Sequence, residues 1–252
     1  MAQRDPIARL IEYNRKLVGN GRDPLWMKRK LDRLTASPFG FLRGTFHLFM
    51  NDWPALGDDP LAPGEAQPIV GDLHLENFGG FKTRDGGVVF DVNDFDETAS
   101  HTPAVDLMRV TTSFLLADEK HGELRAVDRV ESFIESYLAA VRAQDLRPFN
   151  SDTAKLPIAV VEAIDEAKKL SRGSWLEQRV TGPAGERRFV ANDKYFPVKD
   201  PAVREAVAAA VLAFTKTCDQ HPENCPSWGK MLDVAVRIAG TGSLGRFRYS
   251  VL

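Results

Sequence analysis

The chain contains few cysteines. Cys218 and Cys225 are its only two, and both lie near His221. A structural zinc site takes about four ligands, so these three residues do not complete one. The pair therefore indicates two free thiols in a reducing cytoplasm, and a disulfide between them is the alternative.

Long apolar runs and a large net charge are also missing. No stretch approaches the roughly 18 apolar residues that a membrane span needs, and residues 1–6 lack the apolar core of a secretory signal. The net charge of −2 gives no electrostatic basis for binding nucleic acid or an anionic membrane. We therefore expect a cytoplasmic protein without nucleic-acid or membrane partners, and the sequence indicates no particular oligomeric state.

What the chain does contain is the composition of an ordinary globular protein. Hydrophobic residues make up 43% and charged residues 27% of its 252 positions, enough for one large domain or two small lobes. Apolar periodicity predicts helices over residues 6–17, 23–34, 103–120, 124–141, 152–170 and 201–217. Ser37 and Pro38 predict the start of another helix, and turn signals predict hairpins over 68–95 and 175–190. The expected class is α+β and helix-rich.

Two acidic segments flank the first hairpin. Residues 71–77 read Gly-Asp-Leu-His-Leu-Glu-Asn, and residues 91–97 read Asp-Val-Asn-Asp-Phe-Asp-Glu. Between them, residues 78–81 have an extended pattern, 84–87 a turn signal and 88–90 a strand pattern. Such a hairpin brings the end of the first segment beside the second. The alternative is that these acids are simply solvated, because Asp and Asn are favoured in turns.

The residue types in these segments are those of a phosphoryl-transfer site. Magnesium prefers oxygen ligands, which Asn77 and Asp94 can supply, with Asp96 available for a second metal. Asp72 is then free to accept a proton or a hydrogen bond from an attacking hydroxyl. One carboxylate for the hydroxyl, and an amide with a carboxylate for magnesium, are what phosphoryl transfer requires.

Four motifs follow one another in this half of the chain: Gly-Asp-Leu-His-x-x-Asn, the hairpin, Asp-Phe-Asp at 94–96, and Pro-Ala-Val-Asp-Leu at 103–107. This series resembles the catalytic segment of aminoglycoside phosphotransferases and related small-molecule kinases. The resemblance implies a protein-kinase-like catalytic lobe with Asp72 as the catalytic aspartate and Asn77 and Asp94 as metal ligands. It also implies a structural role for Asp106, at the start of the next helix.

A second resemblance covers most of the chain. Its motifs are Ser-Pro-Phe-Gly-Phe-Leu-Arg-Gly at 37–44, Gly-Asp-Leu-His at 71–74, Asn-Asp-Phe-Asp-Glu-Thr at 93–98, and the glycine-rich run near the end. They are similar to those of the bacterial domain-of-unknown-function 2252 family (DUF2252). That family implies no settled activity, so the kinase interpretation rests on the motif chemistry.

The glycine-rich run is the second functional signal. Its three glycines form a G-x-G-x-x-G pattern. Apolar residues alternate over 234–238 before it and over 247–251 after it, which predicts strand–loop–strand rather than the strand–loop–helix of a dinucleotide fingerprint. Strand–loop–strand is typical of the kinase loop that covers ATP phosphates, and an ordinary hairpin is the alternative. The expected nucleotide-binding residues of this loop are Gly240, Gly242, Ser243 and Gly245.

Arg43 and His74 each have two interpretations. Arg43 can reach a nucleotide phosphate with its planar fork of donors, or it can form a structural ion pair. His74 lies inside the Asp72 motif, where a scaffold role in fixing the loop is favoured over that of a catalytic base.

The order of the motifs is permuted relative to ordinary kinases, in which the glycine-rich loop precedes the catalytic aspartate. A kinase also uses a lysine on the strand that follows the loop pair, but the chain ends at Leu252 while the second strand still runs. We therefore expect one kinase-like domain over residues 1–252 that is circularly permuted and C-terminally truncated. Residues 1–230 are its mainly helical catalytic lobe, and residues 231–252 begin an incomplete nucleotide lobe.

The function expected from these motifs is transfer of the γ-phosphate of ATP, with magnesium, to the hydroxyl of an unidentified small-molecule or protein acceptor. Two alternatives stay open. One is a nucleotide-binding pseudokinase or inactive fragment, because the lysine strand is missing. The other is a metal-dependent hydrolase that uses Asp91, Asp94 and Asp96 without a nucleotide loop.

Overall fold

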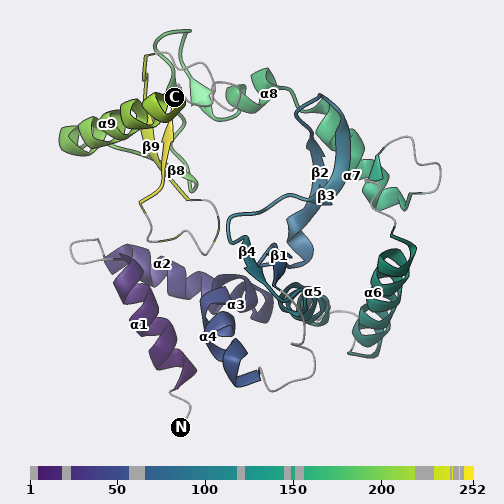
Figure 1. Cartoon of the computed structure of the whole chain (residues 1–252). Coiled ribbons are helices and arrows are strands. Elements are labelled where there is room, and N and C mark those ends of the chain that lie inside the picture. The colour runs from purple at the N-terminus through teal and green to yellow at the C-terminus, as the bar shows by residue number, and fades with distance from the viewer. Residues whose placement is uncertain are drawn as a thin grey trace. The chain divides into compact units, whose positions relative to one another are not determined.

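The computed structural model (Figure 1) describes residues 5–18, 24–56, 66–117, 123–144, 149–150, 156–218, 230–238, 240, 244 and 247–252. The chain divides into two compact units. The first comprises Met1–Tyr13 and Leu31–Leu170, and the second comprises Asn14–Lys30 and Ser171–Leu252. Both units contain helices and small antiparallel sheets, which confirms the predicted α+β class.

Most helices begin and end close to the limits that apolar periodicity predicts. The predicted helices are α1 (Pro6–Val18), α2 (Pro24–Leu34), α5 (Ala104–Ala117), α6 (Glu123–Ala143), α7 (Ile158–Lys169) and α9 (Pro201–Cys218). Of these, α7 begins at Ile158 rather than at the predicted residue 152. The predicted start at Pro38 is also confirmed. Ser37 Oγ accepts a hydrogen bond from the N–H of Gly40 at 3.0 Å, which caps α3 (Pro38–Gly44). α4 (Phe46–Leu56) follows after a single residue.

The predicted hairpin is present in the first unit. β2 (Phe78–Lys82) pairs antiparallel with β3 (Val88–Val92), and the short β5 (Phe149–Asn150) lies on the other side of β3. Helix α7 packs against β2 (Figure 1). The contact is close, because a Cβ added at Gly80 would lie 2.2 Å from the carbonyl oxygen of Ala163. The helix therefore fixes the position of the hairpin.

A second strand pair in this unit is not predicted by the sequence pattern. β1 (Gln67–Ile69) pairs antiparallel with β4 (Ala99–His101), with Ile69 opposite Ala99. Ile69 is buried with Trp53 and Val105 in one hydrophobic cluster. The pair brings together the chain just before the first acidic segment and the chain just after the second.

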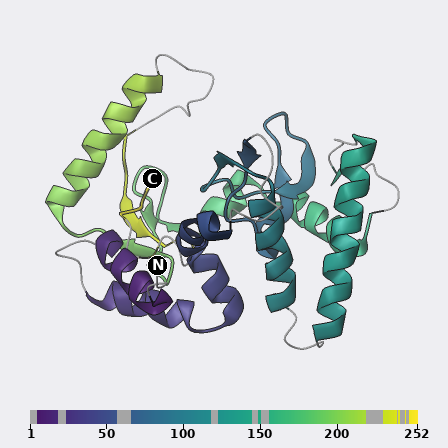
Figure 2. The same ribbon diagram turned by 60° about the horizontal axis from the view of Figure 1, so that its bottom comes forward.

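Helix α5 is the central helix of the site region. It contacts both α3 and α6, and Figure 2 shows α6 running beside it. The rings of Phe114 on α5 and Phe133 on α6 lie 5.4 Å apart between centroids. Val105 and Val110 are completely buried, so α5 is anchored by apolar side chains along its length.

The second unit is built around a three-stranded antiparallel sheet in the order β10-β9-β8. Its elements are α8 (Arg172–Glu177), β6 (Val180–Thr181), β7 (Arg188–Phe189), β8 (Tyr195–Pro197), α9, β9 (Val234–Arg237) and β10 (Tyr249–Val251). β6 and β7 form the hairpin predicted over 175–190, but the hairpin is shorter than predicted because residues 175–177 belong to α8. Asp233, directly before β9, connects that strand to α9 and β7. Its Oδ1 accepts a hydrogen bond from Arg204 on α9 at 3.1 Å, and its Oδ2 accepts one from the N–H of Phe189 on β7 at 2.9 Å.

Within the described residues, no helix has the length and apolar character of a membrane span. The prediction about Cys218 and Cys225 falls outside what the structure describes, because the side chain of Cys218 and all of Cys225 lie there.

Candidate functional site

Asp72 lies in the turn after β1, in a partly buried position. Its side chain is 24% exposed. Burial is the largest influence on the carboxyl group and raises the pKa of Asp72 to about 6. The positive charges of Arg109 and Arg43 act in the opposite direction, while Glu97 adds a smaller upward effect on the pKa. Asp72 is therefore ionised at neutral pH yet more basic than an ordinary aspartate, as a general base should be.

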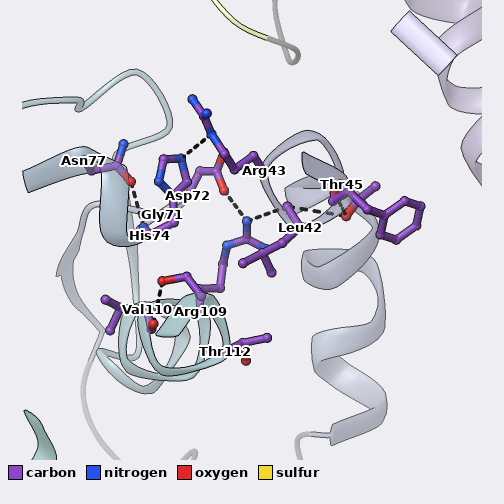
Figure 3. Close-up of polar contacts among 12 residues, drawn as sticks. Leu42, Arg43, Thr45, Gly71, Asp72, His74, Asn77, Arg109, Val110 and Thr112 are labelled. Atoms are coloured by element: carbon purple, nitrogen blue, oxygen red, sulfur yellow. Dashed lines mark hydrogen bonds and ion pairs between the residues drawn. The ribbon is translucent and has the colours of Figure 1, made fainter. Parts of the chain in front are cut away.

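Arg109, on α5, binds this carboxylate from below (Figure 3). Its side chain is 1% exposed, and its Nη2 donates to Asp72 Oδ1 and, at 2.9 Å, to the carbonyl oxygen of Leu42. The guanidinium carbon lies 5.1 Å from the ring centroid of Phe46 and 5.4 Å from that of Phe49. Arg109 therefore links Asp72 to the segment formed by α3 and α4.

Asp106, on the first turn of α5, holds the backbone that precedes Asp72. Its Oδ2 accepts from the N–H of Val70 at 2.7 Å, and its Oδ1 accepts from the N–H of Gly71 at 2.9 Å. Burial raises the pKa of Asp106, and these two hydrogen bonds act against the rise. The contacts support the structural role that the resemblance implies for Asp106.

The Arg43 side chain forms polar contacts with His74 and Glu76. Its Nε donates to His74 Nε2 at 3.2 Å, and its Nη1 forms an ion pair with Glu76. The structural ion pair is therefore present, while contact of Arg43 with a phosphate stays a prediction. Burial, with the charges of Arg43 and Arg109, lowers the pKa of His74 to about 4. A neutral, buried imidazole at this place supports the scaffold interpretation of His74.

Asn77 is buried where the first acidic segment enters β2. Its Oδ1 accepts from the N–H of His74 at 2.7 Å, which closes a short turn (Figure 3). Its backbone carbonyl oxygen accepts from the N–H of Asn93 at 2.9 Å. The hairpin thus returns the chain to Asn77 one residue before Asp94, so the predicted proximity of the two segments is confirmed.

The carboxylates of the second segment face solvent. Asp91, Asp94 and Asp96 are all exposed. Asp91 Oδ1 accepts from the N–H of Val92 at 2.7 Å, and Asp94 Oδ1 accepts from the N–H of Asp96 at 3.4 Å. In the part of the chain that the structure describes, no three His, Cys, Asp or Glu residues are grouped to hold a metal ion. The three-carboxylate centre expected for the hydrolase alternative is therefore not assembled.

The donors of the magnesium prediction are of the right chemical kind. An amide oxygen has two lone pairs, and Asn77 Oδ1 uses one of them on the N–H of His74. Asp94 keeps an exposed carboxylate one residue beyond the Asn77–Asn93 hydrogen bond. Magnesium is commonly held by one or two protein oxygens together with waters and phosphates. By their donor chemistry Asn77 and Asp94 suit such a site, with Asp96 two residues after Asp94, and binding of magnesium there stays a prediction.

The glycine-rich segment belongs to the second unit. β9 and β10 pair antiparallel on either side of it, with Val236 opposite Tyr249, so the predicted strand–loop–strand form is confirmed. Gly240 has a φ of +104°, a conformation that glycine adopts readily. Gly242, Ser243 and Gly245 lie outside the described residues. Binding of ATP by this segment stays a prediction.

A family model described as "Uncharacterized protein conserved in bacteria (DUF2252)" matches residues 22–252. The chain belongs to this family. The resemblance drawn from the motifs at 37–44, 71–74 and 93–98 is thereby confirmed. The DUF2252 match spans the Asp72 turn, the hairpin and the glycine-rich segment. No curated protein and no solved structure matches the chain.

Sequence reasoning missed Arg109, which makes the most buried charged contact of the DUF2252 site. Arg109 lies 37 residues after Asp72, and no motif spacing links the two. One signal was available, because an arginine inside the apolar pattern of a helix requires a partner. Arg109 lies just beyond the Pro-Ala-Val-Asp-Leu motif, three residues after Asp106 and on the same side of the helix.

Proposed function

We propose that this DUF2252 chain is a cytoplasmic, kinase-like phosphotransferase that uses ATP and magnesium on a hydroxyl-bearing acceptor. The observation that carries the proposal is the state of Asp72. It is a partly buried carboxylate with a pKa of about 6, held by Arg109, in the turn that leads to Asn77. A base with a pKa near the working pH accepts a proton most effectively.

Each residue has a distinct part in the proposed site. Asp72 orients the acceptor hydroxyl and accepts its proton. Asn77 and Asp94 hold magnesium, and Asp96 assists with a second ion. Bound magnesium would neutralise the charge that develops on the phosphates of ATP during transfer. Arg43 stands beside His74 and Glu76, where its remaining N–H groups are available to a phosphate oxygen.

The kinase-like character of the fold is part of the proposal. Its support is the series of turn, hairpin and helix in the first unit, with Asp106 fixing the backbone before Asp72. The strand–loop–strand segment around Gly240 in the second unit gives further support as a phosphate-binding element. In sequence order this segment follows the Asp72 site, so the proposed kinase-like arrangement is a permuted one.

Thermal unfolding with added ligands tests the proposal. We expect the chain to be stabilised by magnesium and ATP together, and much less by either one alone, because Asn77 and Asp94 would hold the metal and the phosphates would supply further oxygen ligands. At a ligand concentration hundredfold above Kd, the expected gain is about 2.7 kcal/mol. For a chain of this size it raises the midpoint by roughly 5–10 °C.

The variant that tests the metal site is Asp94→Asn, which removes the charge of one proposed ligand at an exposed position. It should lose the combined effect while unfolding at nearly the wild-type temperature without ligand. Stabilisation by ATP that does not depend on magnesium would favour the pseudokinase alternative. Stabilisation by magnesium alone would favour the hydrolase alternative.

A further inference from the structure

Helix α5 holds Asp72 at two points. The Asp106 carboxylate accepts hydrogen bonds from the N–H groups of Val70 and Gly71, the two residues directly before Asp72. Arg109, three residues further along the same helix, donates to the Asp72 carboxylate. One helix therefore sets both the path of the backbone at Asp72 and the direction of its side chain.

The Arg109 guanidinium is itself fixed by groups other than Asp72. The carbonyl oxygen of Leu42 accepts from Nη2 at 2.9 Å, and the rings of Phe46 and Phe49 lie within 5.4 Å of the guanidinium carbon. The side chain is almost fully buried, so rearrangement would expose its charge to apolar surroundings. Arg109 is thus held as a donor for the Asp72 carboxylate by contacts that do not involve Asp72.

We propose that Arg109 is a positioning residue for the Asp72 carboxylate. It binds Oδ1, keeps the carboxylate in one orientation, and leaves Oδ2 to meet the acceptor hydroxyl. This inference rests on the proposed phosphotransferase function and adds a residue that none of the kinase-like motifs includes.

The charges around Asp72 give the inference a measurable consequence. Arg109 from α5 and Arg43 from α3 favour the ionised carboxylate, whereas Glu97, from the turn before β4, disfavours it. Arg109 is the strongest influence opposing burial. Removing its charge must therefore raise the pKa of Asp72 above about 6. Because only ionised Asp72 can accept a proton, the acidic limb of the pH–rate profile should move to higher pH.

The test compares Arg109→Met with Arg109→Lys by carbon-13 NMR of the Asp72 carboxyl group, recorded against pH on the full chain without nucleotide. Loss of the charge in Arg109→Met should raise the pKa of Asp72 by about 1–3 units. Arg109→Lys keeps the charge and should stay closer to the wild-type value. A folded Arg109→Met protein with the wild-type Asp72 pKa would overturn the positioning role.

A matched control is Arg179→Met, which removes an arginine that also lies over an aromatic ring, 4.2 Å from the centroid of Trp175 in the second unit. It should leave the Asp72 titration unchanged.

The unmodified protein offers a second measurement in case Arg109→Met does not fold. The nitrogen-15 signals of the Arg109 guanidinium should shift with the same pH midpoint as the Asp72 carboxyl. Arg109 guanidinium signals that do not change as Asp72 titrates would contradict the inference.

Hydrolysis of MgATP with water as acceptor is measured on the same proteins. A functional positioning role requires the acidic limb of the rate profile to move with the Asp72 pKa. The NMR measurement needs no nucleotide, so two failures can be told apart. An unshifted pKa in Arg109→Met overturns the inference. A shifted Asp72 pKa in Arg109→Met, combined with a wild-type chain that shows no MgATP turnover at any pH, overturns the proposed function and leaves the coupling of Arg109 to Asp72 standing.

Discussion

Replacing Asp72 with asparagine is expected to lower the rate of ADP release from MgATP by roughly 10²–10⁴-fold, the range typical for loss of a general base. The amide has nearly the shape of the carboxylate and still offers an oxygen to Arg109, but it cannot accept a proton. Affinity for MgATP should stay close to the wild-type value, because Asn77 and Asp94 are unchanged. The loss therefore appears in kcat rather than in KM.

The measurement is steady-state ADP release, with MgATP binding and circular dichroism recorded on the same protein. Asp85→Asn is the matched control, since it makes the same chemical change on an exposed residue in the hairpin turn. It should retain the wild-type rate. An Asp72→Asn protein that folds, binds MgATP and turns over at the wild-type rate would rule out a catalytic role for Asp72.

Gly71→Ala is expected to destabilise the protein by about 2–5 kcal/mol, by two separate effects. Gly71 has a φ of +93°, where an L-residue costs about 1–2 kcal/mol. The added Cβ would also lie 2.3 Å from the carbonyl oxygen of Glu97, a backbone atom that cannot rotate away. Overpacking of this kind typically costs about 1–3 kcal/mol. The substitution also disturbs the N–H that Asp106 accepts, directly beside Asp72.

Gly86→Ala separates the two effects. Gly86 has a φ of +88°, but a Cβ added there meets no atom within 4 Å. Gly86→Ala should therefore lower the free energy of unfolding only by the conformational cost, about 1–2 kcal/mol. Urea unfolding of the two variants measures the difference. Equal losses would mean that the contact between Gly71 and Glu97 does not constrain the turn.

The sequence predicts the local structure of this chain well. Helix limits follow from apolar periodicity, the start of α3 follows from Ser37 and Pro38, and the β2–β3 hairpin follows from its turn residues. These features depend on neighbours a few residues apart. The pairing of β1 with β4 is not predictable in this way, because each strand has three residues and its partner lies about 30 residues away.

The candidate site shows the same difference between features set by neighbouring residues and features set by distant ones. Spacing and chemistry predict Asp72, Asn77 and Asp94 as candidate site residues, and the hydrogen bond between Asn77 and Asn93 confirms that the hairpin joins the two segments. Burial of Asp72 and its partner Arg109 depend on how α5 packs, which no local pattern records. The raised pKa of Asp72, on which the proposed proton-accepting role rests, is therefore a property of the folded chain alone.

The most direct test of the central claim is a crystal structure of this chain with magnesium and a non-hydrolysable ATP analogue. The account predicts a magnesium ion within about 2.1 Å of oxygens from Asn77 and Asp94, with the terminal phosphate of the analogue beside Asp72. A metal–nucleotide complex bound away from these three residues would contradict it.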